Sequence, residues 1–167
     1  MRDQAGDSGT AATFGFLTTV DSPTHGIFGG YLVVDSTGRP LEFHCTTPVK
    51  VSRAQQILYG ATLPGHLHGR QIGASLLAEA TTAPVAILTD SEALLHVRAH
   101  TTLPVGYVGS AGQPGADEGS VSVGGLQVCL PGASMAVVES LEGLAGAVDL
   151  REPFERIRAA IEEAQRH

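Results

Sequence analysis

A chain of 167 residues, 43% of them hydrophobic and 16% charged, is long enough for one domain with a sizeable core and short for two. Its formal net charge of −7, with ten Lys and Arg residues, argues against broad nucleic-acid binding, which needs a basic surface. No apolar run approaches the roughly 20 residues of a membrane span. The polar N-terminus does not have the pattern of a signal peptide, so we expect a cytoplasmic protein with no membrane contact.

The first part of the chain predicts an antiparallel meander of three strands. It follows a stretch at 1–12 that we expect to be a disordered or tag-like tail. The three strands are rich in β-forming residues and are separated by short polar turns; they are expected at 13–20, 27–34 and 40–46. The second turn contains Gly38, which can adopt a positive φ angle. The last strand alternates between an apolar face and a face that carries Glu42 and His44.

The middle of the chain predicts helices and parallel strands. A capping box formed by Ser52 and Gln55 starts a first helix, which Gly60 could end. A second helix is expected at about 66–80, and glycines every fourth residue along it predict close packing on a neighbouring element. Strands at 84–89 and 104–108 flank a short helix at 91–99, an order that predicts a parallel pair with a right-handed crossover.

The last part of the chain predicts additions to this core. We expect a Gly-rich loop at 109–120, then a hairpin whose strands at 121–130 and 134–140 turn around Pro131-Gly132. A final helix is expected from Pro153 to about Gln165. The prediction is therefore a single α/β domain at 13–167, with its core at 13–108 and a C-terminal hairpin and helix at 121–165.

The cysteines and histidines give no complete metal motif. Cys45 and Cys129 are far apart, and we expect both to be reduced and largely buried thiols. His66 and His68 are two residues apart, so on a helix their side chains point in different directions. We expect polar surface histidines there. In an extended segment they could share a face and bind a transition metal together with His44 or Cys45.

The order of elements and a few short motifs resemble the ribonuclease H-like fold. Thr89-Asp90-Ser91, which follows an apolar strand, is similar to the TDS that ends the fourth strand in ribonuclease HI-type enzymes. Asp21-Ser22, followed by Gly29-Gly30-Tyr31, is similar to the acid of the first strand and the Gly-rich second strand. The resemblance covers about 13–108. It implies a mixed sheet, made of an antiparallel three-strand meander plus parallel strands and flanked by helices.

The resemblance also implies a set of carboxylates that binds two divalent cations, Mg²⁺ or Mn²⁺, which activate water. Asp21 and Asp90 occupy two of the four positions, whereas the third, early in the first helix, holds Gln55. The acids that could complete the set are Glu42, Glu79 and Glu152. Each aspartate also has a structural interpretation, because Asp90 or Ser91 could cap the next helix and Asp21 could form an Asx-turn.

Two functions follow from these observations. The first is a non-catalytic interaction or assembly subunit on a degenerate ribonuclease H-like scaffold, which binds a protein partner or itself and needs no cofactor. The Gln in place of an acid and the acidic net charge favour it. The alternative is a metal-dependent nuclease or phosphohydrolase that uses Asp21 and Asp90, completed by an acid such as Glu152. Fold resemblance by itself does not decide between them.

Overall fold

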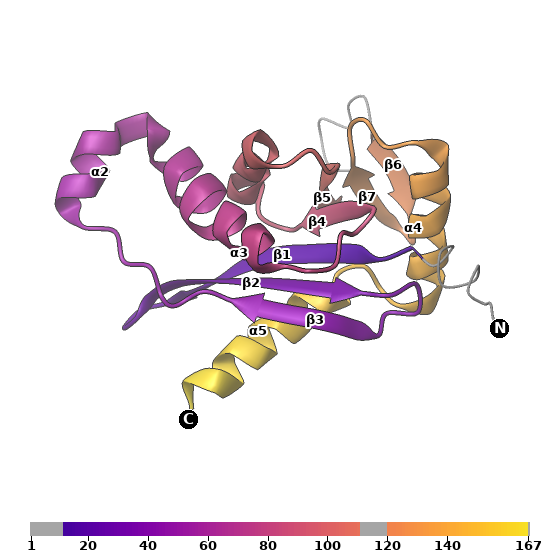
Figure 1. The fold of residues 1–167 in the computed structure, drawn as a ribbon, viewed down its shortest axis with the longest axis horizontal. Coiled ribbons are helices and arrows are strands. Elements are labelled where there is room, and N and C mark those ends of the chain that lie inside the picture. The colour runs from indigo at the N-terminus through magenta and orange to yellow at the C-terminus, as the bar shows by residue number, and fades with distance from the viewer. Residues whose placement is uncertain (1–11, 111–119, 167) are drawn as a thin grey trace.

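A computed structural model describes residues 12–110 and 120–166, which form a seven-stranded sheet with helices on both faces (Figure 1). The strands lie in the order β3-β2-β1-β4-β5-β7-β6. Their bounds are β1 (Phe14–Ser22), β2 (Gly26–Val34), β3 (Pro40–Cys45), β4 (Ala86–Thr89), β5 (Val105–Ser110), β6 (Ser120–Val123) and β7 (Leu126–Cys129). The predicted tail at 1–12, apart from Ala12, and positions 111–119 of the predicted loop lie outside the described residues.

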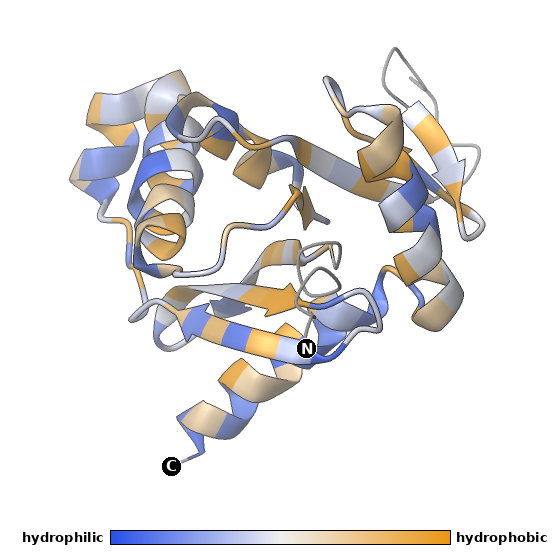
Figure 2. Cartoon of the chain, turned by 45° about the vertical axis from the view of Figure 1, so that its right-hand side comes forward, coloured by the Kyte–Doolittle hydropathy of each residue, from blue (hydrophilic) through white to orange (hydrophobic). Residues whose placement is uncertain are grey.

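The sheet is mixed, as the resemblance implied. β1, β2 and β3 pair antiparallel, in a register that runs from Phe14 opposite Val34 to Ser22 opposite Gly26 for the first pair. β4 pairs parallel with both β1 and β5. The crossover from β4 to β5 contains a helix, whereas β2, β3 and the helices after them lie between β1 and β4 in the chain. The predicted α/β fold class is therefore confirmed. The third strand's alternation is also present, and Figure 2 shows hydrophobic and hydrophilic residues taking turns along β3.

The helices lie in two layers, each with its own apolar core. One face of the sheet packs against α4 (Met135–Ala147) and α5 (Glu152–Gln165), and this core contains Phe14, Phe16 and Phe154. The other face packs against η2 (Gly65–Ala74), α3 (Ser75–Glu79) and η3 (Glu92–His100). Successive residues of β1 alternate between the two cores: Phe14 and Phe16 belong to the first and Leu17 to the second.

The helical connection between β3 and β4 has an unusual shape. It begins with α2 (Arg53–Tyr59), where the predicted capping box of Ser52 and Gln55 is present and Gly60 ends the helix. A short 3₁₀ turn, η1 (Gly60–Thr62), follows. The predicted second helix is present, but its first ten residues, η2, form a π-helix and α3 completes it.

The close packing predicted from the spaced glycines is confirmed. A Cβ atom on Gly69 would lie 2.9 Å from the Cβ of His96, and one on Gly73 would lie 2.7 Å from a methyl group of Val97. Both of these neighbours belong to η3, so the glycines allow η2 and η3 to come together.

The C-terminal part differs from the prediction. The hairpin consists of β6 and β7 and turns at Gly124-Gly125, whose φ angles are +59° and +81°. Two successive positive φ values are typical of a two-residue hairpin turn, and glycine adopts them without strain. The second predicted strand, 134–140, was wrong: apart from Ser134 it lies in α4. Ser134 caps that helix, because its hydroxyl accepts a hydrogen bond from the Val137 amide at 3.3 Å.

Three smaller expectations also need correction. Gly109 belongs to β5 and Ser120 to β6, so the ends of the predicted loop are strand residues. Both cysteines are free, but Cys45 is exposed and Cys129 half-buried, so neither is the largely buried thiol that was expected. None of the helices in the described ranges, 12–110 and 120–166, has the length and apolar character needed to cross a membrane.

Candidate functional site

Asp90 lies where the sequence predicted it, directly after β4 at the carboxyl end of the parallel strands. Its carboxylate accepts a hydrogen bond from the Thr18 hydroxyl of β1 at 2.6 Å. Arg158 of α5 forms an ion pair with the same carboxylate and donates to the Thr18 hydroxyl at 3.2 Å. The predicted helix cap is wrong, because the Ser91 side chain does not cap η3 and Asp90 binds these two residues instead.

A cavity of about 290 Å³ lies beside this ion pair. Its walls include Tyr107 and Gly109 of β5 and Arg151 and Glu155 near the start of α5. Arg151 has a partner of its own, because its guanidinium lies 3.3 Å from the Asp149 carboxylate. The cavity therefore has charges of both signs on its walls, with Asp90 and Arg158 already neutralising each other.

Asp21 does not join Asp90. Asp21 is a residue of β1, opposite Ile27, and not part of the Asx-turn that the sequence suggested. Side chains along a strand alternate between the two faces, and Asp21 is three residues after Thr18. Thr18 and Asp90 face α5, so Asp21 faces the opposite layer, where its charge acts on His68 of η2.

Glu152 and Gln55 also have other partners. Glu152 forms an ion pair with Arg156 at 2.8 Å, and Arg156 donates to the Gly38 carbonyl at 2.8 Å, which ties the start of α5 to the turn between β2 and β3. The Gln55 side chain accepts from the Ser52 amide at 3.1 Å in the capping box of α2. Across 12–110 and 120–166, no group of three or more His, Cys, Asp or Glu side chains is arranged to hold a metal ion. The residues present thus do not fit the two-cation site.

The two histidines of η2 are separated in the structure. The ring of His66 stacks on Tyr59, with 4.3 Å between the ring centroids. The Nδ1 atom of His68 is buried and has no hydrogen-bond partner among the described residues. Burial lowers the pKa of His68, and nearby His96 lowers it further, while Asp21 acts in the opposite direction.

His68 should make folding sensitive to mild acid. Its pKa in the folded protein is below the value of about 6.5 expected for the unfolded chain, so the unfolded chain binds the proton first. The free energy of unfolding should therefore fall as the pH decreases below about 6.5. His68→Gln should weaken this dependence between about pH 7 and pH 5, as measured by urea unfolding. An equal decrease in both proteins would contradict the assignment.

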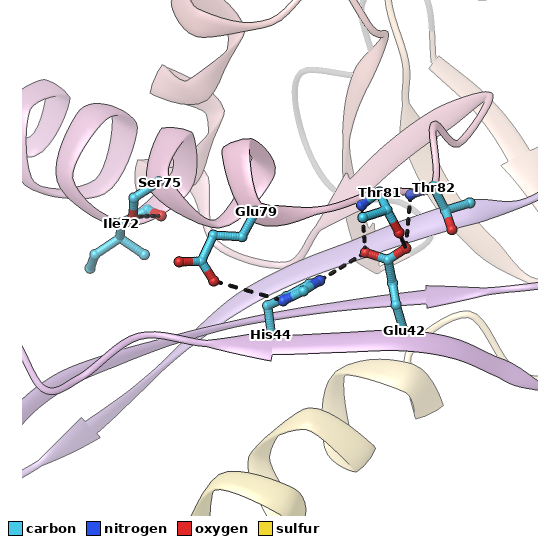
Figure 3. A network of polar contacts seen from close by, with 7 residues as sticks. All are labelled: Glu42, His44, Ile72, Ser75, Glu79, Thr81 and Thr82. Atoms are coloured by element: carbon cyan, nitrogen blue, oxygen red, sulfur yellow. Dashed lines mark hydrogen bonds and ion pairs between the residues drawn. The ribbon is translucent and has the colours of Figure 1, made fainter.

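The structure also contains a polar network that sequence reasoning missed (Figure 3). Glu42 of β3 accepts hydrogen bonds from the Thr81 amide at 2.9 Å, the Thr81 hydroxyl at 2.8 Å and the Thr82 amide at 2.8 Å. The His44 ring is 2.8 Å from the same carboxylate and 3.9 Å from that of Glu79. The network joins the edge strand to the segment after α3.

These contacts stabilise the ionised form of the Glu42 carboxyl. Its side chain is 12% exposed, and hydrogen bonds from Thr82, His44 and Thr81 hold the pKa of the carboxyl well below its usual range. In the sequence, the visible sign of this network was that Glu42 and His44 lie on one face of a predicted strand. That pattern did not indicate the Thr81-Thr82 segment, which is about 40 positions away in the chain.

Comparison with known proteins gives limited information. No family model matches the chain, and no curated protein matches it. Among solved structures, Argonaute from Marinitoga piezophila in complex with a 5′ OH guide RNA is similar to 78% of this chain at 12% identity and a TM-score of 0.40. The same protein with guide RNA and target DNA is similar to 77% at 9% identity and a TM-score of 0.34. The match spans 24% of the length of the Argonaute chain in each case.

Proposed function

We propose that this protein is a non-catalytic interaction or assembly subunit built on a ribonuclease H-like scaffold. The ion pair between Arg158 and Asp90 is the observation that carries the proposal. A divalent cation at Asp90 would have to approach a guanidinium of the same sign and compete with it for the carboxylate. Asp21, the other acid that the resemblance assigned, faces the opposite side of the sheet.

Helix α2 supports the interaction part of the proposal. None of its seven residues is buried, and Figure 1 shows it at the outer end of the molecule, away from the sheet. Ile57 and Leu58 are 67% and 82% exposed on it. So short a helix is marginal on its own and is normally held by packing of an apolar face. Ile57 and Leu58 are therefore the apolar side chains through which we propose that α2 contacts a partner.

The experiment compares the assembly state of the wild-type protein and a surface variant, each purified from its native cells under mild conditions. Light scattering coupled to gel filtration should give a mass above that of the monomer for the wild-type protein, from a second copy or a stoichiometric partner. Ile57→Asp with Leu58→Asp should reduce this mass to that of the monomer, because charges on α2 cannot be desolvated at an apolar contact.

Met135→Asp is the matched control. Met135 is a large apolar residue that is 73% exposed on a different helix, α4, so its replacement should leave the assembly intact. A wild-type protein that is a monomer with no stoichiometric partner would contradict the proposal. So would Mn²⁺-dependent cleavage of a nucleic acid that disappears in Asp90→Asn.

A further inference from the structure

A second cavity, of about 310 Å³, lies at the opposite end of the parallel strands from Asp90. Its walls come from α3, from the segment that leads into β4 and from the segment that leads into β5. Most of this wall is apolar, with Leu77, Ala83, Pro84 and Leu103 among its residues. The hydroxyl-bearing residues on it are Tyr31, Thr81, Thr82 and Thr101.

Tyr31 gives this cavity a buried polar group. The side chain comes from β2 and is fully buried, yet its hydroxyl has no hydrogen-bond partner among the described residues. Gly15 of β1 makes room for it, since a Cβ atom there would lie within 3 Å of the hydroxyl. A buried hydroxyl without a partner carries a desolvation cost, and such groups in native proteins are uncommon enough to require an explanation.

The hydroxyl remains a proton donor at physiological pH. Burial raises the pKa of Tyr31, and the negative charge of Glu42 raises it further. Glu42 is not the missing partner, because its carboxylate oxygens accept from Thr81, Thr82 and His44. The same contacts hold Thr81 and Thr82 at the cavity wall, so the Glu42 network fixes one side of the cavity, and the buried Tyr31 hydroxyl is left without a partner among the described residues.

We propose that this cavity binds a small, uncharged, mainly apolar molecule that has a carbonyl oxygen, and that the carbonyl accepts a hydrogen bond from Tyr31. Apolar walls with few placed polar groups are the usual composition of a small-molecule site. The described residues that line it include no Asp, Glu, Lys or Arg, so apart from His100 the wall offers no cationic or anionic side chain to a charged ligand. This binding activity is separate from the protein contact of α2 and does not depend on it.

Cyclohexanone is a suitable probe, because it combines an apolar ring with one carbonyl. In a ¹H–¹⁵N NMR titration of the full chain, it should shift the amide signals of Thr81, Thr82 and Thr101 in a saturable way. Tyr31→Phe should weaken the affinity roughly 3- to 10-fold, as expected for the loss of one hydrogen bond. Tyr107→Phe, which removes a hydroxyl beside the other cavity, should leave the affinity unchanged.

Three results would overturn the proposal. The first is the absence of saturable shifts at these amides at millimolar probe. The second is equal affinity in Tyr31→Phe and wild type. The third is a Tyr31→Phe protein that unfolds at clearly lower urea, because the hydroxyl would then already have a partner, such as a bound water. The expected stability of this variant is equal to or above that of the wild type, since the ring and its packing are retained.

Discussion

Replacing Glu42 with alanine should lower the free energy of unfolding by about 2–4 kcal/mol. The substitution removes a carboxylate that accepts from two amides and a hydroxyl of the Thr81-Thr82 segment and that pairs with His44. Hydrogen bonds to a charged acceptor stabilise more than neutral ones, and the carboxylate is 12% exposed. Urea unfolding followed by circular dichroism measures the change. Glu79→Ala is the matched control: Glu79 is 72% exposed and its contact with His44 is 3.9 Å long, so a much smaller effect is expected.

Glu42 should also affect the acid sensitivity of the fold. Its pKa in the folded protein is lowered below the value of about 4.3 expected for the unfolded chain, so acid protonates the unfolded chain first. The stabilising contribution is therefore complete above about pH 4.3 and is lost as the pH falls toward the folded pKa. Glu42→Gln should show a flatter decline of stability in this range. An unchanged decline would assign the acid sensitivity to other carboxyl groups. The pH range in which Glu42 affects stability lies below the range in which His68 does, so the two residues can be studied separately.

The parts of the fold that the sequence predicted correctly depend on local signals. The capping box of Ser52 and Gln55 spans four residues, and the strands of the meander are separated by short polar turns. The hairpin near the C-terminus was misplaced because two Gly-containing turns compete there. Gly124-Gly125 forms the hairpin, whereas Pro131-Gly132 precedes the cap of α4, and both are ordinary turn sequences.

The candidate site was less predictable because its partners are far apart in the chain. Asp90 was correctly placed after a strand, but Arg158 is 68 positions away, and its side chain reaches Asp90 through the position of α5 on the sheet. The predicted first strand ended at Val20, which left Asp21 in a turn. In the structure β1 continues to Ser22, and strand alternation then fixes Asp21 on the face opposite Asp90.

Two adjacent glycines in β2 let both helical layers approach the sheet. Gly29 faces the layer of η2 and Gly30 faces α5; a Cβ atom on either would lie within 3 Å of a methyl group, that of Ile72 or that of Ile157. Gly30→Ala should lower the free energy of unfolding by about 2–3 kcal/mol, because the added methyl group has to displace buried Ile157. The entropy gained by replacing a strand glycine offsets only about 0.5–1 kcal/mol of this.

Chemical unfolding can separate this steric effect from a general intolerance to substitution. Gly143→Ala is the control, since a Cβ atom there would meet nothing within 4 Å and alanine favours helix α4; it should stabilise the protein by about 0.5–1 kcal/mol. Ile157→Leu removes the methyl group that Gly30→Ala would meet. Combined, the two substitutions should cost less than the sum of their separate effects, by about 1 kcal/mol. Additive losses would mean that the Ile157 contact does not determine the need for glycine at position 30.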